Sequence, residues 1–299
     1  MASLVKRAEH TVSKALDAAS QLSLMAGMQT VVATEDIIRA AEEIHRDFEV
    51  AKLNAYRARP GNPNQIAFAH FGKAVATLGP YVGYFNRVYG FTQEEIAFLP
   101  EIVRFYDTTQ TNFELTVSPL VASLELSEAL VSAGFRPGSY HAKFFAPLPL
   151  PPGSHDEARR VTVSRVASGQ LDEFLAVMLE GWGMPRQHWE GAKENMRLRL
   201  GIPGVSFFWA SVNGERSGGS ILYVHGAGGY LADAATVPAR RRQGCQQALI
   251  LARATEARTQ GCERLFGCAR FGDSSFRNMQ RAGLRLVSSD QTWHFRFAE

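Results

Sequence analysis

The chain has 299 residues, of which 45% are hydrophobic, 20% are charged and 10% are aromatic. This ordinary globular composition excludes a disordered, collagen-like or coiled-coil protein, and the length predicts about two domains of roughly 150 residues each. Part of the net charge of +3 is concentrated at Arg240, Arg241 and Arg242. The excess is not spread as a nucleic-acid-binding face requires, so we expect no nucleic-acid partner.

The cysteines and the apolar runs indicate the cellular setting. Cys245, Cys262 and Cys268 form no C-x-x-C pair, so we expect no disulfide framework and no metal site, and a cytoplasmic location is the simplest expectation. No run of about 18 apolar residues occurs, so no membrane partner is expected. Residues 1–30 predict an N-terminal helical segment, amphipathic or frayed, with a transit peptide as the alternative.

Hydrophobic periodicity and turn residues predict alternating strands and helices along the chain. The predicted helices are 35–58, 93–106, 120–133, 168–181, 186–199, 244–260 and 274–282. The predicted strands are 65–70, 73–78, 112–117, 139–145, 160–166, 205–212, 218–225, 229–236, 264–269 and 291–297. Because both halves alternate in this way, the predicted fold class is α/β (α+β).

A proline-rich stretch near the midpoint predicts a linker. Four prolines fall between Pro147 and Pro152, and they cannot continue a helix or a central strand. We therefore predict an N-terminal domain at 1–150 and a C-terminal domain at 155–299. Both halves end in a helix, a glycine and a strand, which indicates a structural duplication, although chance recurrence of this common unit is the alternative.

The segment from Tyr230 to Leu249 carries the chemistry. It predicts a strand of small residues, a turn at Pro238, a basic loop and a helix that begins near Gly244. Such a loop directs backbone N–H groups, a helix dipole and arginines at one point, which makes an anion site suited to a pyrophosphate. Gly244 allows the backbone to approach the phosphates closely.

This segment resembles the GCN5-related N-acetyltransferase family, whose signature is Gln/Arg-x-x-Gly-x-Gly/Ala. The matching stretch is Arg241-Arg242-Gln243-Gly244-Cys245-Gln246, in which Gln246 departs from the usual Gly or Ala. The strand and the helix that follow keep the family's order, so the resemblance covers roughly 160–297. It implies two acetyltransferase-like mixed-sheet domains in tandem, of which the first is degenerate and the second binds acyl-CoA. An unrelated phosphate loop or a basic surface turn is the alternative.

The resemblance implies acetyl-CoA, or another acyl-CoA, bound between two splayed parallel strands as the co-substrate, and no metal. The backbone groups expected to hold the pantetheine and polarise the thioester carbonyl are those of Ala234, Ala235, Thr236 and Val237. The N–H groups expected to hold the pyrophosphate are those of Arg242, Gln243, Gly244, Cys245, Gln246 and Gln247, with the side chain of Arg241 or Arg242 nearby. Asn278 is expected to contact the cofactor as well, and Cys245 is interpreted as a small spacer.

Acyl transfer to an amine needs an acid for the leaving thiolate. Many members of the family place a tyrosine in the last helix for this purpose, and the matching position here is Met279, which cannot donate a proton. Ser275, Asn278 or water would then serve, or the thiolate leaves unassisted.

The amine also needs a base, and the candidates are Asp233 and Tyr230 on the strand before the loop, with Glu180 and His188 in the region of the helix predicted at 168–181. Pairing of Asp233 with an arginine and core packing of Tyr230 are the alternatives. If Thr236 faces the cofactor, strand alternation turns Asp233 away from it, unless a bulge reverses that direction.

The acceptor is expected where the family has a variable loop. The candidate acceptor residues are Glu180, Trp182, Met184 and His188, with solvated or core positions as the alternatives. Aromatic residues of the first half, such as Tyr84, line the acceptor cleft or form ordinary core. We predict an N-acyltransferase for a small-molecule amine, monomeric or homodimeric. A protein or peptide amine acetyltransferase and a low-turnover acyl-CoA-binding regulatory module are the alternatives.

Overall fold

The computed structural model describes residues 32–81, 83–150 and 161–298. Its helices are α2 (Glu35–Arg57), α3 (Leu99–Asp107), α4 (Leu124–Ser132), α5 (Leu171–Gly181), α6 (Trp189–Arg197), α7 (Cys245–Thr259) and α8 (Ser274–Arg281). Its strands are β1 (Ala67–Phe71), β2 (Ala74–Leu78), β3 (Arg87–Tyr89), β4 (Phe113–Val117), β5 (Arg136–Pro147), β6 (Val161–Arg165), β7 (Val205–Val212), β8 (Glu215–His225), β9 (Gly228–Thr236), β10 (Arg264–Arg270) and β11 (Arg285–Phe295). The predicted N-terminal helical segment and residues 151–154 of the predicted linker lie outside the described residues.

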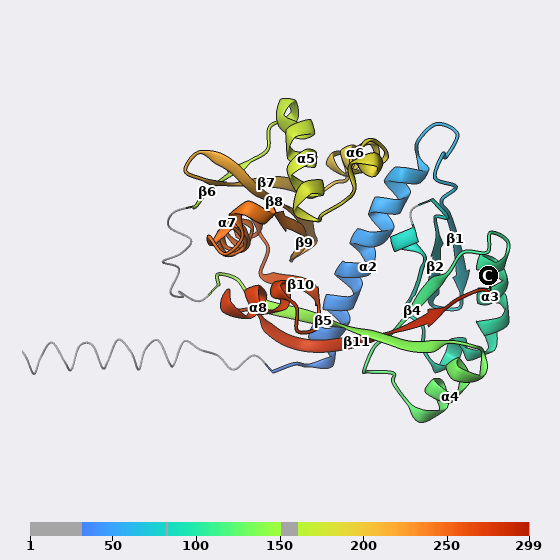
Figure 1. Cartoon of the computed structure of the whole chain (residues 1–299). Coiled ribbons are helices and arrows are strands. Elements are labelled where there is room, and N and C mark those ends of the chain that lie inside the picture. The colour runs from blue at the N-terminus through green and yellow to red at the C-terminus, as the bar shows by residue number, and fades with distance from the viewer. Residues whose placement is uncertain (1–31, 82, 151–160, 299) are drawn as a thin grey trace, which may run out of the picture. The chain divides into compact units, whose positions relative to one another are not determined.

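All described strands belong to one mixed sheet, in the order β1-β2-β3-β4-β11-β5-β10-β9-β8-β7-β6 (Figure 1). Neighbouring strands are antiparallel except for the pairs β3–β4 and β9–β10, which are parallel. This arrangement confirms the predicted α/β fold class. Within the described residues, no helix combines the length and the apolar content needed to cross a membrane.

The sheet is continuous across the predicted domain boundary because β5 pairs with strands of the second half and β11 pairs with strands of the first half. β5 lies between β10 and β11, and β11 lies between β5 and β4. The last strand of the first half therefore joins the second half, and the last strand of the chain joins the first. The division into domains at residues 150 and 155 stays a prediction. Strands of both predicted domains are hydrogen-bonded to one another within one sheet.

Helix α2 belongs to the first half but packs on the sheet beside strands of the second half (Figure 1). Thr34 caps its N-terminus, and Ile38, Ile44 and Phe48 lie on its buried face. A Cβ atom at Gly228 would approach Ile44 of α2, whereas one at Gly229 would approach Ala257 of α7. Since neighbouring residues of a strand point to opposite faces, α2 and α7 cover opposite faces of β9.

The predicted elements match the structure except at their ends and at one strand. The helix predicted from residue 120 begins at Leu124, because the Ser123 hydroxyl accepts a hydrogen bond from the Leu126 N–H at 3.0 Å. The helices predicted from residues 93 and 186 begin as 3-10 turns, Gln93–Phe98 and Arg186–His188. Strand β3 was not predicted, because three residues are too short to show an alternating pattern.

A partly buried carboxyl on α2, that of Glu42, gives the stability of this fold a pH dependence. The Ser118 hydroxyl donates to Glu42 Oε1 at 2.5 Å, and burial, with a smaller effect of Asp290, raises the pKa of Glu42 to about 7. The native state therefore binds more protons than the unfolded state between about pH 4.5 and pH 7, so stability falls as the pH rises through this window.

We expect Glu42→Gln to raise the free energy of unfolding at pH 8 and to leave it nearly unchanged at pH 4.5. Above pH 7 the wild-type carboxylate is charged in a site that disfavours the charge, whereas Gln is neutral at both pH values. Urea unfolding at the two pH values measures this difference. An equal effect at both would mean that Glu42 acts through its hydrogen bond to Ser118 and not through its charge.

Candidate functional site

An opening in the sheet begins where β9 and β10 stop pairing. The parallel pairing runs from Gly228 and Arg264 to Leu231 and Gly267. Beyond that point β9 continues to Thr236 without a partner on its β10 side. Among the described residues no strand pairs with this part of β9 on that side, although the carbonyl oxygens of Ala232 and Ala234 accept hydrogen bonds from Arg253 and Trp182.

A bulge in β9 sets the direction of its side chains. Between the pairs Ser220–Ala234 and Leu222–Leu231, β9 contains one residue more than β8. The bulge allows Tyr230 and Asp233, three residues apart, to point to the same face, where both meet side chains of α2. The bulge precedes Asp233, so it does not reverse the direction of Asp233 relative to Thr236: the Thr236 hydroxyl meets Gln246 of α7 on the opposite face, and the parity objection stands.

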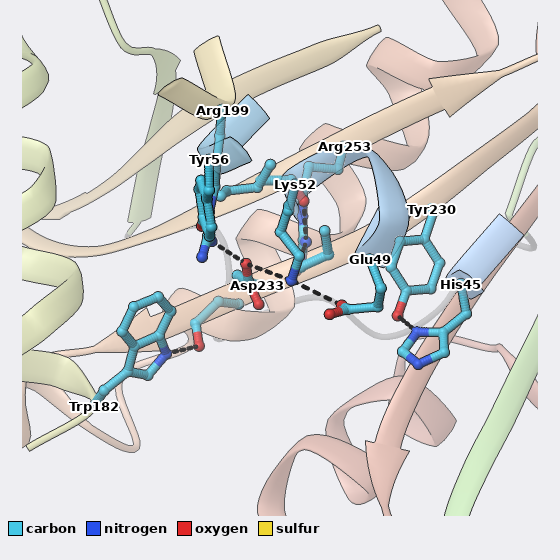
Figure 2. A network of polar contacts seen from close by, with 12 residues as sticks. His45, Glu49, Lys52, Tyr56, Trp182, Arg199, Tyr230, Asp233 and Arg253 are labelled. Atoms are coloured by element: carbon cyan, nitrogen blue, oxygen red, sulfur yellow. Dashed lines mark hydrogen bonds and ion pairs between the residues drawn. The ribbon is translucent and has the colours of Figure 1, made fainter. Parts of the chain in front are cut away.

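Arg253 of α7 fills this bulge from the other face. Its Nη1 donates to the carbonyl oxygens of Ile221 and Ala232, both at 2.9 Å, and its Nε donates to that of Leu249 at 3.1 Å (Figure 2). The residue is 1% exposed, and burial lowers the pKa of its guanidinium to about 9, so it is charged at neutral pH. A buried cation therefore supports the strand at the mouth of the opening.

The predicted anion loop has the backbone that a pyrophosphate site needs. Gly244 is the N-cap of α7 with φ +83°, and Arg242 also has a positive φ of +62°. The free N–H groups at the start of this 15-residue helix face the loop. Gly244 suits this position because a side chain at a φ of +83° is strained.

The three loop arginines have different surroundings. Arg240 forms an ion pair with Glu215, and Arg241 donates to the carbonyl oxygen of Gly181 at 3.1 Å. Arg242 is exposed, and its side chain has no hydrogen bond or ion pair with any residue that the structure describes. Of the two arginines proposed from the sequence, Arg242 is therefore the one whose charge is available to an anion.

The remaining loop residues hold the loop to the sheet. Gln246 Nε2 donates to Thr236 Oγ1 at 2.9 Å, so the residue that departs from the family pattern joins α7 to the end of β9. Gln243 donates to the carbonyl oxygen of Ala239 at 3.4 Å. Cys245 is buried, and burial raises the pKa of its thiol, which agrees with a spacer role.

A cavity of about 270 Å³ passes the opening and has walls from both faces of the sheet. The side of α7 and α8 contributes Gln246, Ile250, Arg253, Ser275, Asn278 and Met279. The first half contributes His45, Phe48, Glu49, Tyr84 and His141. Strand β9 contributes Tyr230 to Ala234 between them. The cavity therefore joins the predicted cofactor side to a wall that comes from the other half of the chain.

The candidate catalytic residues Tyr230, Asp233, Ser275 and Asn278 all line this cavity. Tyr230 is buried, its hydroxyl lies 2.7 Å from His45 Nδ1, and burial raises its pKa well above the usual value. Met279 is buried as well, and a Cβ atom on Gly267 would lie 2.5 Å from its sulfur. The thioether therefore packs closely over Gly267 of β10.

Asp233 is held by cations. Arg199, in the 3-10 helix Leu198–Gly201, donates to its Oδ2 at 2.5 Å, and Lys52 Nζ lies 4.0 Å from the same oxygen. Burial acts to raise the pKa of Asp233, but Lys52 and Arg199 outweigh it and hold the pKa below its usual value. The structure thus contains the arginine pair that was the alternative interpretation of this residue.

These contacts form one buried polar network, drawn in Figure 2. Lys52 Nζ lies 2.8 Å from Glu49 Oε1, which links Glu49 through Lys52 and Asp233 to Arg199. Arg199 also donates to the hydroxyl of Tyr56 at 2.7 Å. The network places charges of the first half directly beside β9.

The candidate acceptor residues are not gathered at the cavity. Glu180 and His188 are exposed, and neither they nor Met184 lie in its wall. The indole of Trp182 donates to the carbonyl oxygen of Ala234 at 3.3 Å, so Trp182 contacts the strand at the edge of the opening. That carbonyl, one of the groups expected to hold the pantetheine, therefore already has a partner.

Sequence reasoning missed the residues that α2 brings to the site. His45, Glu49, Lys52 and Tyr56 follow one another at spacings of three or four residues, so they share one face of the helix. That face also carries the buried residues Ile44 and Phe48. Polar residues on the apolar face of a predicted amphipathic helix are the sequence signal that could have identified these site residues.

Comparison with solved structures identifies the fold. A GCN5-related N-acetyltransferase from Kribbella flavida matches with a TM-score of 0.58 and 14% identity, over 83% of this chain and 96% of that one. A tandem GCN5-related N-acetyltransferase from the clavulanic acid biosynthesis pathway matches with a TM-score of 0.56 and 11% identity, over 90% and 98%. A Staphylococcus epidermidis protein described as functionally unknown matches with a TM-score of 0.57 and 10% identity, over 79% and 96%.

Comparisons at the level of sequence find no such match. No protein-family model matches the chain, and no curated protein matches it. The chain therefore has the fold of the GCN5-related N-acetyltransferases, in agreement with the resemblance noted in its sequence. The likeness to a tandem member along nearly the whole chain confirms the predicted tandem architecture.

Proposed function

We propose that the protein is an N-acyltransferase that moves an acetyl or other acyl group from acyl-CoA to the amine of a small molecule. The observation that carries the proposal is the cavity at the opening between β9 and β10, which reaches Gln246 in the first turn of α7. The anion loop with Arg242 and Gly244 directly precedes that turn, and the part of β9 beyond its pairing with β10 lines the cavity. The fold supports N-acetyltransferase activity in general.

The residues of the anion loop and of this part of β9 fit acyl-CoA. The N–H groups from Arg242 to Gln247 and the side chain of Arg242 would hold the pyrophosphate. Backbone groups from Ala234 in β9 to Val237, the residue after the strand, would hold the pantetheine and polarise the thioester carbonyl. The carbon of that carbonyl is the atom that a neutral amine attacks, and the CoA thiolate is the leaving group.

The proposed acid is Ser275, Asn278 or water, since Met279 has no proton to give. Ser275 and Asn278 lie in the cavity wall, where they can meet a leaving thiolate. Tyr230 and Asp233 stay candidate bases, although the lowered pKa of Asp233 makes that carboxylate a weak one.

The proposed acceptor is small because the cavity holds only about 270 Å³. A protein or peptide amine would need an open groove. The low-turnover regulatory module stays the second candidate, and the buried Met279 at the family's tyrosine position is the observation that favours it. The proposed location is the cytoplasm, supported by the free state of Cys245, Cys262 and Cys268.

We expect CoA to raise the melting temperature of the wild-type protein and to have no such effect on Gly244→Val. A ligand that binds only the native state stabilises it, and a side chain at Gly244 would keep the phosphates from the backbone. Gly261→Val is the matched control, because Gly261 has a similar φ of +86° at the other end of α7 and open space around it.

Both variants should lose comparable stability, on the order of 1–3 kcal/mol, from backbone strain. Differential scanning fluorimetry with and without CoA separates the two effects. A full CoA shift in Gly244→Val would exclude the loop as the pyrophosphate site, and no shift in the wild type would exclude the proposed function.

A further inference from the structure

The cavity wall on the α2 face comes largely from the first half of the chain. His45, Phe48 and Glu49 project from α2, and Tyr84 lies in the 3-10 helix Gly83–Phe85. The loop proposed for the pyrophosphate lies at the start of α7, on the opposite face of β9. A thioester that passes between β9 and β10 would therefore meet its acceptor on the side of α2.

Glu49 is the carboxylate that α2 presents to this cavity (Figure 2). It is only 6% exposed, and its Oε1 lies 2.8 Å from Lys52 Nζ. Its Oε2 has no hydrogen bond or ion pair with any described residue, and it is not among the described polar atoms sealed from solvent without a partner. One oxygen thus holds the side chain in place, and the other is available to a ligand.

Two other carboxylates line the wall. Asp273 caps α8, where its Oδ1 accepts a hydrogen bond from the Phe276 N–H at 2.7 Å. Asp233 is also less suited than Glu49 to take a proton. Its Oδ2 is shared by Arg199 and Lys52, and these cations hold its pKa below the usual value. Glu49 has Lys52 alone as an ion-pair partner among the described residues. Asp233 and Glu49 therefore differ in their surroundings, with Asp233 fixed as a partner of cations and Glu49 open to the cavity.

We propose that Glu49 receives the ammonium group of the acceptor and removes its proton, so that the acceptor is a primary alkylamine. This assignment rests on the proposed function. The carboxylate of Glu49 takes one proton, and the nitrogen lone pair forms a C–N bond to the thioester carbon. The C–S bond then breaks, the CoA thiolate leaves, and the second proton lost by nitrogen neutralises it. Glu49 returns its proton to solvent.

The charged and titratable groups around Glu49 favour this transfer. Helix α2 contributes Lys52 and His45, and the 3-10 helix Gly83–Phe85 contributes Tyr84. The sheet contributes Arg87 and Tyr89 of β3, His141 of β5, Tyr230 and Asp233 of β9, and Cys268 of β10, with Arg199 next to Asp233 and Arg253 from α7. Burial lowers the pKa of His45 well below its usual value, so His45 is neutral. The cations Lys52, Arg199 and Arg253 disfavour an ammonium ion nearby, which eases the loss of its proton to Glu49.

The test compares Glu49→Gln with Glu43→Gln in the full chain, using acetyl-CoA with benzylamine or aniline at pH 7.5. Glu43 is exposed on the same helix, so its variant removes an equal charge away from the cavity. Benzylamine is protonated at this pH and aniline is neutral. We expect Glu49→Gln to lower kcat/KM for benzylamine at least about tenfold and to change it little for aniline. Glu43→Gln should change neither value.

Each result decides the assignment. The role of Glu49 is overturned if Glu49→Gln leaves the ratio of kcat/KM for benzylamine to kcat/KM for aniline unchanged. This holds whether the two values stay the same or fall together. If Glu49→Gln does not fold, the double variant Glu49→Gln, Lys52→Met removes the whole ion pair and should give the same fall in the ratio. A wild-type protein that binds CoA but releases no thiol with either amine overturns the proposed transferase function and this assignment with it.

Discussion

Replacing Asp290 by Asn is expected to lower the free energy of unfolding by about 3–5 kcal/mol. Asp290 of β11 lies 3.2 Å from Lys143 of β5, and both side chains are 3% exposed. Burial acts to lower the pKa of Lys143, but Asp290 outweighs it and raises that pKa. Removing Asp290 leaves a buried lysine without its partner, between the two strands that join the halves of the sheet. Urea unfolding at pH 7 measures the loss.

The double variant Lys143→Met, Asp290→Leu provides the control. It removes both charges from the same buried position, so it should lose much less stability than Asp290→Asn. Because the pKa of Lys143 is raised in the native state, the stabilisation by the pair is fully present below about pH 10 and is lost as the pH rises through the native pKa. A loss below about 1 kcal/mol in Asp290→Asn would contradict a stabilising role for this pair.

The part of the fold that depends on local patterns could be predicted from the sequence. Three local features made this segment predictable: the small residues before Pro238, the glycine at position 244 and the apolar side of the following helix. They lie within about twenty residues of one another in the sequence. Their geometry is decided by neighbours along the chain, so β9, the anion loop and α7 appear where they were predicted.

The exchange of β5 and β11 could not be predicted in the same way. The residues of β5 pair with Arg264–Arg270 on one side and with Arg285–His294 on the other, more than a hundred positions away. An apolar strand shows the same pattern of side chains whichever strands lie beside it. The choice of partners is decided by long-range packing, in which α2 and the Lys143–Asp290 pair take part.

The cavity wall on the α2 face of β9 was predicted only in part for the same reason. Tyr230 and Asp233 were selected because they lie on the strand that precedes the loop. Their actual partners, His45, Lys52 and Arg199, come from helices elsewhere in the chain. The role of a carboxylate depends on the charged groups that lie near it in space. The sequence could therefore not decide whether Asp233 is a base or the partner of an arginine. It also gave no indication that Glu49 lies beside β9.

Replacing Arg253 by Met is expected to reduce both stability and turnover. The Arg253 guanidinium supplies the donor for the carbonyl oxygens of Ile221 and Ala232 at the bulge, and each oxygen left unpaired in the interior costs about 1–3 kcal/mol. Loss of the buried charge offsets part of this cost, so we expect a net loss of a few kcal/mol. The larger effect should fall on catalysis, because the bulge positions the β9 backbone groups that would meet the thioester carbonyl.

Arg258→Met is the matched control, because Arg258 is exposed near the end of the same helix and its removal changes the net charge equally. CoA should still raise the melting temperature of Arg253→Met, since the N–H groups of the anion loop lie at the start of α7 and do not depend on the bulge. Turnover should fall at least tenfold, by analogy with the loss of one oxyanion donor, which costs about 10²–10³-fold. A variant that keeps full turnover would show that the bulge holds its shape without Arg253, and that the thioester groups of β9 are positioned by the pairing with β8 alone.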